Sequence, residues 1–136
     1  MGGAIGKSIV RVEGPDKATG ELQYVSDTLP PRTLIGKIFR SPIPHGRIVR
    51  LDLEGARKTP GVRSVLGHQD VPRHPMNPIF NQASPRANLL AKDEVVLDDV
   101  VRYIGQPVAL VVAETEDQAE AALSCIRVEW EELPAV

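Results

Sequence analysis

The side chains best suited to metal binding or nucleophilic catalysis are three histidines and one cysteine. The histidines are His45, His68 and His74, and their spacing fits no zinc signature; neither CxxC nor HExxH occurs. A metal site needs several converging donors, so we expect none in this chain. Cys125 lies late in an amphipathic segment, next to its apolar face, where a small buried thiol is the expected role.

Paired carboxylates form a second group that could perform chemistry, because two acids converging in a cleft can act as general acid and base. The adjacent pairs are Asp93–Glu94, Asp98–Asp99 and Glu131–Glu132. Neighbouring residues of an extended strand point in opposite directions. We therefore expect these acids on the solvated surface.

Two short motifs combine polar side chains with residues that restrict the backbone. The eight residues concerned are Arg40, Ser41, Pro42, His45, Arg47, Gly105, Gln106 and Pro107. The prolines of RSPIPHGRI favour a rigid turn between strands, and Gln106 could either bind a ligand or hold a turn. We expect a structural or domain-interface role for all eight, with no catalytic, cofactor-binding or metal-binding residue among them.

The length, composition and net charge of the chain are those of one ordinary globular domain. The chain has 136 residues, 42% hydrophobic and 25% charged, with a net charge of -2. Basic residues form no run and the few aromatic residues are scattered, so we expect no nucleic-acid binding. A single cysteine, no signal peptide and no apolar run long enough to span a bilayer predict a cytoplasmic protein with no membrane segment.

Hydrophobic periodicity predicts the elements that must position these residues. Alternation favours strands over 34–40 and 47–53, the second with Val49, Leu51 and Leu53 on its buried face. A short helical turn over 54–61 ends at a Pro-Gly pair, and a third strand follows over 62–66.

The last third of the chain predicts a strand, a helix and a further strand. Residues 108–113 are continuously apolar, as in a strand covered on both faces. A helix follows, with Thr115 and Gln118 placed for a capping box and one apolar face made by Ala119, Ala122, Leu123 and Ile126. Residues 127–131 return as a strand. The expected class is α+β, with a mixed sheet and this strand-helix-strand unit at its end.

The segment Val71–Pro85 is a long loop, with four prolines, two asparagines and little periodicity. Two interpretations stay open for it. The loop either lines a site or interface of a larger assembly, or is disordered.

In chain order, three segments resemble the large, molybdenum-binding subunit of the xanthine dehydrogenase and aldehyde oxidase family. They are IGKSIVRVEGPDKATGELQYVSD, RSPIPHGRIVRLDLEGARKTPGV and VRYIGQPVALVVAETEDQAEAALSCIRVEWEELPAV, and together they leave only the proline-rich loop unmatched. The chain departs from the family pattern at Ile43, Pro44, Gly46 and Trp130. We expect these four changes to affect local packing rather than the assignment of the domain to the family.

The resemblance implies an a/b hammerhead domain over residues 1–136, the N-terminal part of a longer subunit. In this family, molybdenum held by molybdopterin inserts water-derived oxygen into a carbon-hydrogen bond of an aldehyde or N-heterocycle. Electrons then leave through 2Fe-2S clusters and usually a flavin, on partner subunits or domains. The family's catalytic residues lie in later domains, so none is transferred to this sequence.

The resemblance also implies what this domain contacts. It would pack on the molybdopterin-binding domain, and Pro72–Leu90 would help shape the substrate entrance by steric contacts. In isolation, the exposed apolar interface would favour self-association. The alternative is a free-standing interaction module that kept the fold without the enzyme. A small self-sufficient enzyme using His45 or Cys125 lacks a supporting constellation of residues.

Overall fold

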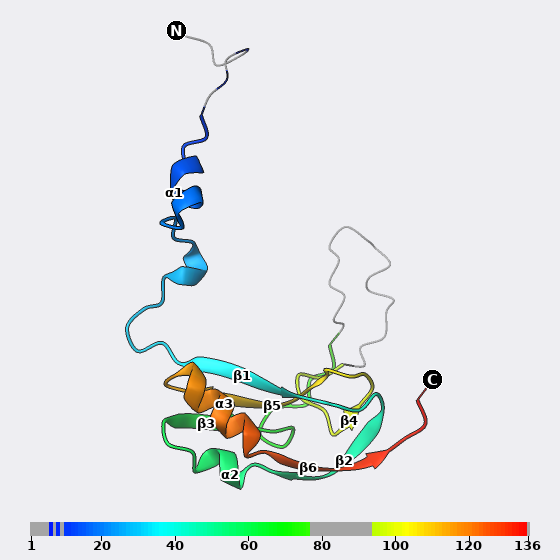
Figure 1. The fold of residues 1–136 in the computed structure, drawn as a ribbon. Coiled ribbons are helices and arrows are strands. Elements are labelled where there is room, and N and C mark those ends of the chain that lie inside the picture. Colours follow the sequence, from blue (N-terminus) through cyan, green and yellow to red (C-terminus); the bar gives the residue numbers. More distant parts are fainter. Residues whose placement is uncertain (1–5, 7, 9, 77–93, 136) are drawn as a thin grey trace. The chain divides into compact units, whose positions relative to one another are not determined.

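The computed structural model describes residues 6, 8, 10–76 and 94–135, and the chain divides into two compact units, Met1–Thr33 and Leu34–Val136. The first unit contains helix α1 (Gly14–Thr19) and a 3-10 helix, η1 (Val25–Asp27), neither of which was predicted (Figure 1). Helix α1 starts with a proline in its first turn and ends at Gly20, whose φ of 77° suits glycine. No residue of α1 is buried.

The described residues of the second unit form two three-stranded antiparallel sheets. The first has the order β1 (Ile35–Arg40), β5 (Pro107–Ala113), β3 (Val62–Leu66), and the second the order β4 (Val100–Val101), β2 (Gly46–Asp52), β6 (Arg127–Glu132). The α+β class is confirmed. The expected mixed sheet is replaced by two antiparallel ones, because the strands on either side of the last helix join different sheets.

Two helices pack on the first sheet: α2 (Glu54–Arg57) and α3 (Glu116–Ser124) (Figure 1). The predicted capping box of α3 is confirmed, since Gln118 N donates to Thr115 Oγ1 at 3.3 Å and Thr115 N donates to Gln118 Oε1 at 3.1 Å. The predicted apolar face of α3 is confirmed at Ala119, Ala122 and the half-buried Leu123, whereas Ile126 is buried but lies beyond the end of the helix. Among the described residues, no helix is long and apolar enough to cross a bilayer.

Within the part of the chain that the structure describes, the core consists of two hydrophobic clusters that β5 connects. The first lies between the first sheet and the helices: Leu53, Ala56, Val65, Ala109, Val111, Ala113, Ala119, Ala122 and Ile126. The second contains Ile48, Val101 and Val108. Strand β5 is therefore covered on both faces at Val108 and Ala109. Leu110 and Val112 are half-buried, so the predicted double coverage does not extend along the whole strand.

Strand β2 differs from its predicted pattern because it contains a β-bulge. Ile48 pairs with Trp130 and Arg50 pairs with Glu129, so Val49 is an extra residue on this strand. Its side chain is 63% exposed, whereas Ile48 is buried. The prediction that Val49 shares a buried face with Leu51 and Leu53 is wrong, because the bulge changes the alternation.

Two further predictions concern Cys125 and the proline-rich loop. Cys125 is exposed, which corrects the expected buried thiol: α3 ends at Ser124, and the cysteine caps the helix rather than continuing its apolar face. Most of Val71–Pro85 and of Pro72–Leu90, together with Asp93, lies outside the described residues.

Candidate functional site

The two motifs selected from the sequence meet at the ends of β1 and β5. Ser41 N donates to Gln106 O at 2.9 Å, and Gly105 N donates to Ser41 O at 2.8 Å. Arg40 Nη1 donates to Gly105 O at 2.8 Å, and Arg40 lies opposite Pro107 in the strand pairing. Gly105 has a φ of 92°, which glycine adopts without strain. The structure thus brings Arg40, Ser41, Gly105, Gln106 and Pro107 together.

The Ser41 hydroxyl holds the proline-containing turn of the first motif. It donates to Ile43 O at 2.8 Å and accepts from Ile43 N at 3.2 Å, so the side chain closes the turn on itself. Ser41 is buried, while Pro42 is exposed at the outside of the turn. The turn is therefore held by a satisfied polar group rather than by proline alone.

Gln106 uses its amide to hold the turn that follows β4. Its Oε1 accepts from Arg102 N at 2.7 Å, and its Nε2 donates to Val100 O at 3.2 Å. The side chain is buried and both ends are bonded to backbone. Of the two interpretations of Gln106, the structure shows the turn-holding one.

Asp98 is the group that the sequence interpretation missed. Its side chain is 1% exposed, although the acidic pairs were expected on the surface. Its Oδ2 lies 2.8 Å from Arg102 Nη1, and its Oδ1 lies 3.0 Å from Arg73 Nη1 and accepts from Asp99 N at 2.9 Å. Burial is tolerated because guanidinium and backbone donors replace the lost water. Arg73 is too far away in sequence for the pairing to be recognised from residue spacing.

These contacts form one continuous polar network. It runs from Arg40 through the Gln106 turn to Arg102, Asp98 and Arg73. Close to its end, an antiparallel bridge joins Met76 and Glu94, with N–O distances of 2.7 and 3.3 Å. The network therefore connects the two turns to the segments that flank residues 77–93. We call these segments the stems: residues 72–76 on one side and 94–98 on the other.

His45 and Arg47 lie outside this network and contact the end of the chain instead. His45 Nδ1 is 2.6 Å from Pro134 O, and since a carbonyl only accepts, this nitrogen carries the proton. Leu133 N donates to His45 O at 3.1 Å. Arg47 Nε lies 3.7 Å from a carboxylate oxygen of Glu131, which makes a loose and exposed ion pair.

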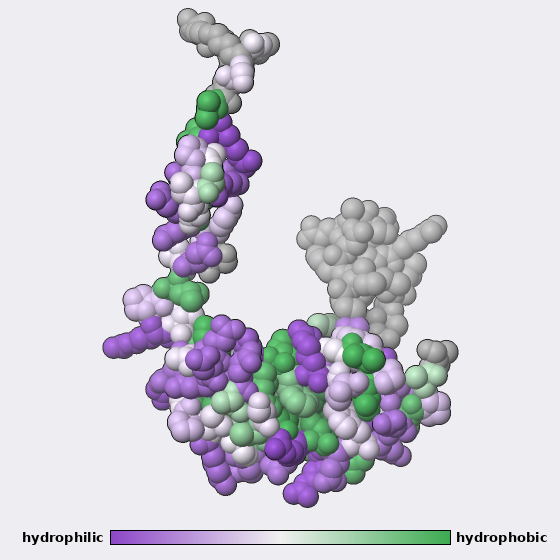
Figure 2. Space-filling model, in the orientation of Figure 1, coloured by the Kyte–Doolittle hydropathy of each residue, from purple (hydrophilic) through white to green (hydrophobic). Residues whose placement is uncertain are grey.

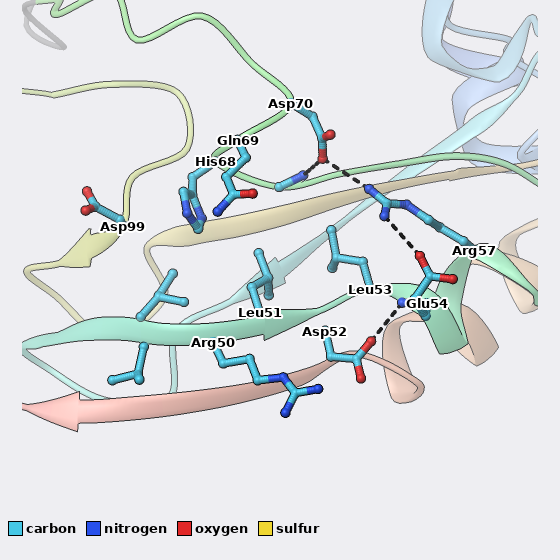
Figure 3. Close-up of a pocket in the computed structure, with 13 residues that line it drawn as sticks. Arg50, Leu51, Asp52, Leu53, Glu54, Arg57, His68, Gln69, Asp70 and Asp99 are labelled. Carbon is cyan, nitrogen blue, oxygen red and sulfur yellow. Dashed lines mark hydrogen bonds and ion pairs between the residues drawn. The ribbon is translucent and has the colours of Figure 1, made fainter.

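A cleft of about 600 Å³ opens between β2, the start of α2 and the loop after β3 (Figure 3). Three of its charged side chains bind one another: Arg57 bridges Glu54 and Asp70 at 3.3 Å each, and Asp70 also accepts from Gly67 N at 2.8 Å. His68 Nδ1 is buried and has no hydrogen-bond partner in the described part of the chain. Among the described residues that line the cleft, no nucleophile lies next to a free base.

Asp99 makes the stability of the folded domain depend on pH. Its hydrogen bonds with the Asp98 carboxyl group and with Arg73 lower the pKa of Asp99 from 3.8 to about 2. Because the folded pKa is the lower one, this stabilisation is complete above the unfolded pKa and is lost as pH falls towards 2. We expect urea midpoints of the parent chain and the Asp99→Asn variant to differ at pH 5 and to converge between pH 4 and pH 2. A constant difference across this range would contradict the assignment.

Within the described ranges, no group of three or more His, Cys, Asp or Glu side chains is placed to hold a metal ion. The most buried carboxylate, Asp98, is already bound to two arginines and a backbone amide. The contacts of the network hold turns and stems in place within the described residues.

Comparison with known proteins identifies a family model and several longer relatives that this chain matches. Residues 19–134 match the family model described as aldehyde oxidase and xanthine dehydrogenase, a/b hammerhead domain. A probable xanthine dehydrogenase subunit of Bacillus subtilis is 43% identical over 93% of this chain and 16% of the relative. The nicotinate dehydrogenase large molybdopterin subunit of Eubacterium barkeri is 37% identical over 97% of this chain and 29% of the relative.

Solved structures agree with the sequence comparison. The crystal structure of quinoline 2-oxidoreductase from Pseudomonas putida 86 superposes with a TM-score of 0.72 at 34% identity, covering 96% of this chain and 16% of that one. The aldehyde oxidoreductase of Desulfovibrio desulfuricans gives a TM-score of 0.74 at 27% identity, over 95% of this chain and 15% of that one. The chain thus spans less than a third of the length of each of these proteins.

Proposed function

Because the chain belongs to the aldehyde oxidase and xanthine dehydrogenase family, we propose that it is the non-catalytic hammerhead domain of a molybdenum-dependent oxidoreductase. In this proposal it packs on the molybdopterin-binding domain of the same subunit and helps shape the substrate entrance. The observation that carries the proposal is the match over residues 19–134, within relatives several times longer than this chain.

The described residues do not fit the family's redox groups. Molybdopterin-bound molybdenum supplies insertion of water-derived oxygen into a carbon-hydrogen bond, and the 2Fe-2S clusters require cysteine ligands. This chain has one cysteine, and the Asp98 carboxylate is occupied by its arginines. Those groups, and a flavin, would therefore be held by other domains or subunits, and no catalytic step is assigned to this chain.

The first unit supports a packing role because its described residues form no buried core. The side chains of Val10, Val12 and Val25 are 82%, 91% and 94% exposed, and α1 has no buried residue. Figure 2 shows hydrophobic residues (green) at the surface of both units, between hydrophilic areas (purple). A segment of this size without buried apolar area does not offset its loss of conformational entropy. It needs a surface to pack on, which the molybdopterin-binding domain would supply.

The turn between β4 and β5 supports the same role in the second unit. Tyr103 and Ile104 are 48% and 67% exposed, although the turn that carries them is held by Arg40, Ser41 and Gln106. Apolar side chains on a fixed turn lose little entropy on docking. They are therefore suited to an interface with a neighbouring domain.

The relatives' names support the proposed substrate class. Those proteins are named for xanthine, nicotinate, quinoline and aldehydes, so the proposed substrate is an aldehyde or N-heterocycle. From the family resemblance we further propose that electrons pass to iron-sulfur and flavin partners and that the enzyme is cytoplasmic. We propose no nucleic-acid or membrane partner. In isolation, the exposed apolar side chains would favour self-association, which light scattering at rising concentration measures.

The His45→Ala variant tests the packing role in the complete protein. Removing the bond to Pro134 O should destabilise the domain by about 1 kcal/mol and free the residues after β6. We expect a smaller fraction of assembled, molybdenum-loaded enzyme, with kcat per bound molybdenum within about twofold of the parent. Size-exclusion chromatography with metal analysis and steady-state kinetics measure both quantities.

The matched control is His74→Ala, since His74 is exposed and makes no side-chain hydrogen bond in the described residues. It should leave assembly unchanged. A tenfold loss of kcat per molybdenum in His45→Ala, with normal assembly, would contradict the packing role. Isolation of the natural protein as a stable complex without molybdopterin would favour a free-standing interaction module instead.

A further inference from the structure

The first sheet has one side that its helices cover and one side that they do not. Helices α2 and α3 pack on the side where Ala109, Val111 and Ala113 are fully buried. Side chains alternate along a strand, so the residues between these three point to the opposite side, as do their paired neighbours on β1 and β3. We call this side the outward face, and the strand register assigns to it Gly36, Ile38, Ser64, Leu66, Leu110 and Val112.

The outward face is apolar and carries no charged side chain. Leu66, Leu110 and Val112 are half-buried, and Ile38 is 40% exposed. In the described part of the chain, none of these four belongs to a hydrophobic cluster of the core or packs against one. An antiparallel sheet with one side in water normally alternates apolar and polar residues, whereas residues 108–113 are apolar at every position. This pattern is typical of a strand that is covered on both sides.

The second sheet provides an internal comparison, because its exposed side is charged. Arg47 Nε lies 3.7 Å from Glu131 Oε2, and Arg50 Nη1 lies 3.8 Å from Glu129 Oε1. All four side chains are more than half exposed. Cross-strand pairs of opposite charge are suited to water. The outward face of the first sheet, with apolar residues at the equivalent positions, is suited to an apolar partner instead.

The outward face leads to the turn between β4 and β5. Arg40 follows Ile38 by two residues on β1, and its Nη1 donates to Gly105 O at 2.8 Å. Gly105 directly follows Tyr103 and Ile104, the exposed apolar residues of that turn. The end of β1 therefore links the outward face to a turn that is itself suited to an interface.

We propose that the outward face docks on an uncharged, apolar surface of the same polypeptide, contributed by another domain of a longer subunit. Two observations select this occupant. The chain spans less than a third of the length of its relatives, so each relative has much more chain than this domain. The outward face offers no charge to pair with, so a charged group placed against it would lose its water without compensation. The identity of the longer subunit rests on the proposed function.

Photo-crosslinking in the complete protein identifies what covers this face. The photoreactive amino acid p-benzoylphenylalanine replaces Ile38 in one variant and Val49, which is 63% exposed on the second sheet, in the control. We expect mass spectrometry to find a cross-link from position 38, and not from position 49, to a peptide of the same polypeptide outside residues 1–136. A cross-link to a peptide within residues 1–136 or to a different polypeptide would overturn the proposal, as would a yield no higher than that of the control.

Charge substitution at the same two positions forms the second arm. Both side chains are exposed in this chain, so Ile38→Lys and Val49→Lys should give similar urea midpoints in the purified chain. In the complete protein, Ile38→Lys should lower the yield of the folded subunit on size-exclusion chromatography about tenfold, and Val49→Lys should not. Equal yields of the two variants would contradict the docking role.

Two further provisions keep the outcomes separate. If Ile38→Lys unfolds the purified chain, the neutral, β-branched variant Ile38→Thr replaces it, and the cross-link decides the proposal. Neither the cross-link nor the yield depends on enzyme activity. A complete protein that contains no molybdenum would therefore refute the proposed function, while the cross-link from position 38 still shows whether the outward face docks on another domain.

Discussion

The Asp98→Asn variant is expected to lose about 3 kcal/mol of unfolding free energy, because it removes the charge that two guanidinium groups and a backbone amide surround. Losses on breaking a buried ion pair reach about 5 kcal/mol when the partner stays buried. Here Arg73 and Arg102 are 63% and 46% exposed and regain water, so the lower figure applies. Urea denaturation at pH 7 measures the change.

Asp117→Asn is the matched control for Asp98→Asn, since Asp117 lies exposed in the first turn of α3. Removing its charge weakens only the interaction with the helix dipole, by about 0.5 kcal/mol. Equal losses in the two variants would show that the burial of Asp98 carries no special stabilisation. Asp98→Asn should also increase hydrogen exchange at the amides of the Met76–Glu94 bridge.

A second large loss, about 2–3 kcal/mol, is expected for Gly61→Ala. Gly61 has a φ of 80°, and a Cβ there would overlap the amide of Gln118. That amide forms half of the capping box that starts α3. The substitution therefore adds backbone strain at the turn and displaces the cap of a helix far away in sequence. Thermal or urea denaturation of the purified chain measures the loss.

Two further variants separate these contributions. Gly105→Ala carries the same backbone strain, at a φ of 92°, but its Cβ would have no neighbour within 4 Å, so about 1 kcal/mol is expected. In a Gln118→Ala background, Gly61→Ala should also cost only about 1 kcal/mol, because the clash and the cap are already gone. Full additivity of Gly61→Ala and Gln118→Ala would show that the two residues do not interact.

Local patterns gave correct predictions where the determining contacts are close in sequence. The Thr115–Gln118 capping box, the apolar face of α3 and the strand over 62–66 each depend on neighbours within one or two turns. The family resemblance was likewise readable from ordered motifs, and the match over residues 19–134 confirms it.

Predictions failed where a distant residue or a break in periodicity decides the outcome. Val49 is exposed because an extra residue in β2 interrupts the alternation, and Cys125 is exposed because α3 ends just before it. The sheet arrangement differs because antiparallel partners come from distant parts of the chain. Periodicity indicates which face of a segment is apolar, but not which strand it meets.

RSPIPHGRI and the Gly105-Gln106-Pro107 turn illustrate both kinds of outcome. Their residue types and order are enough to assign them to the hammerhead family and to indicate that prolines and glycines restrict two turns. Their contacts could be known only from the fold: Arg40 and Ser41 bond the second turn, His45 instead holds Pro134, and Asp98 is buried. The reason is that a hydrogen bond or ion pair between distant residues requires the fold to bring donor and acceptor within about 3 Å, which leaves no trace in local spacing.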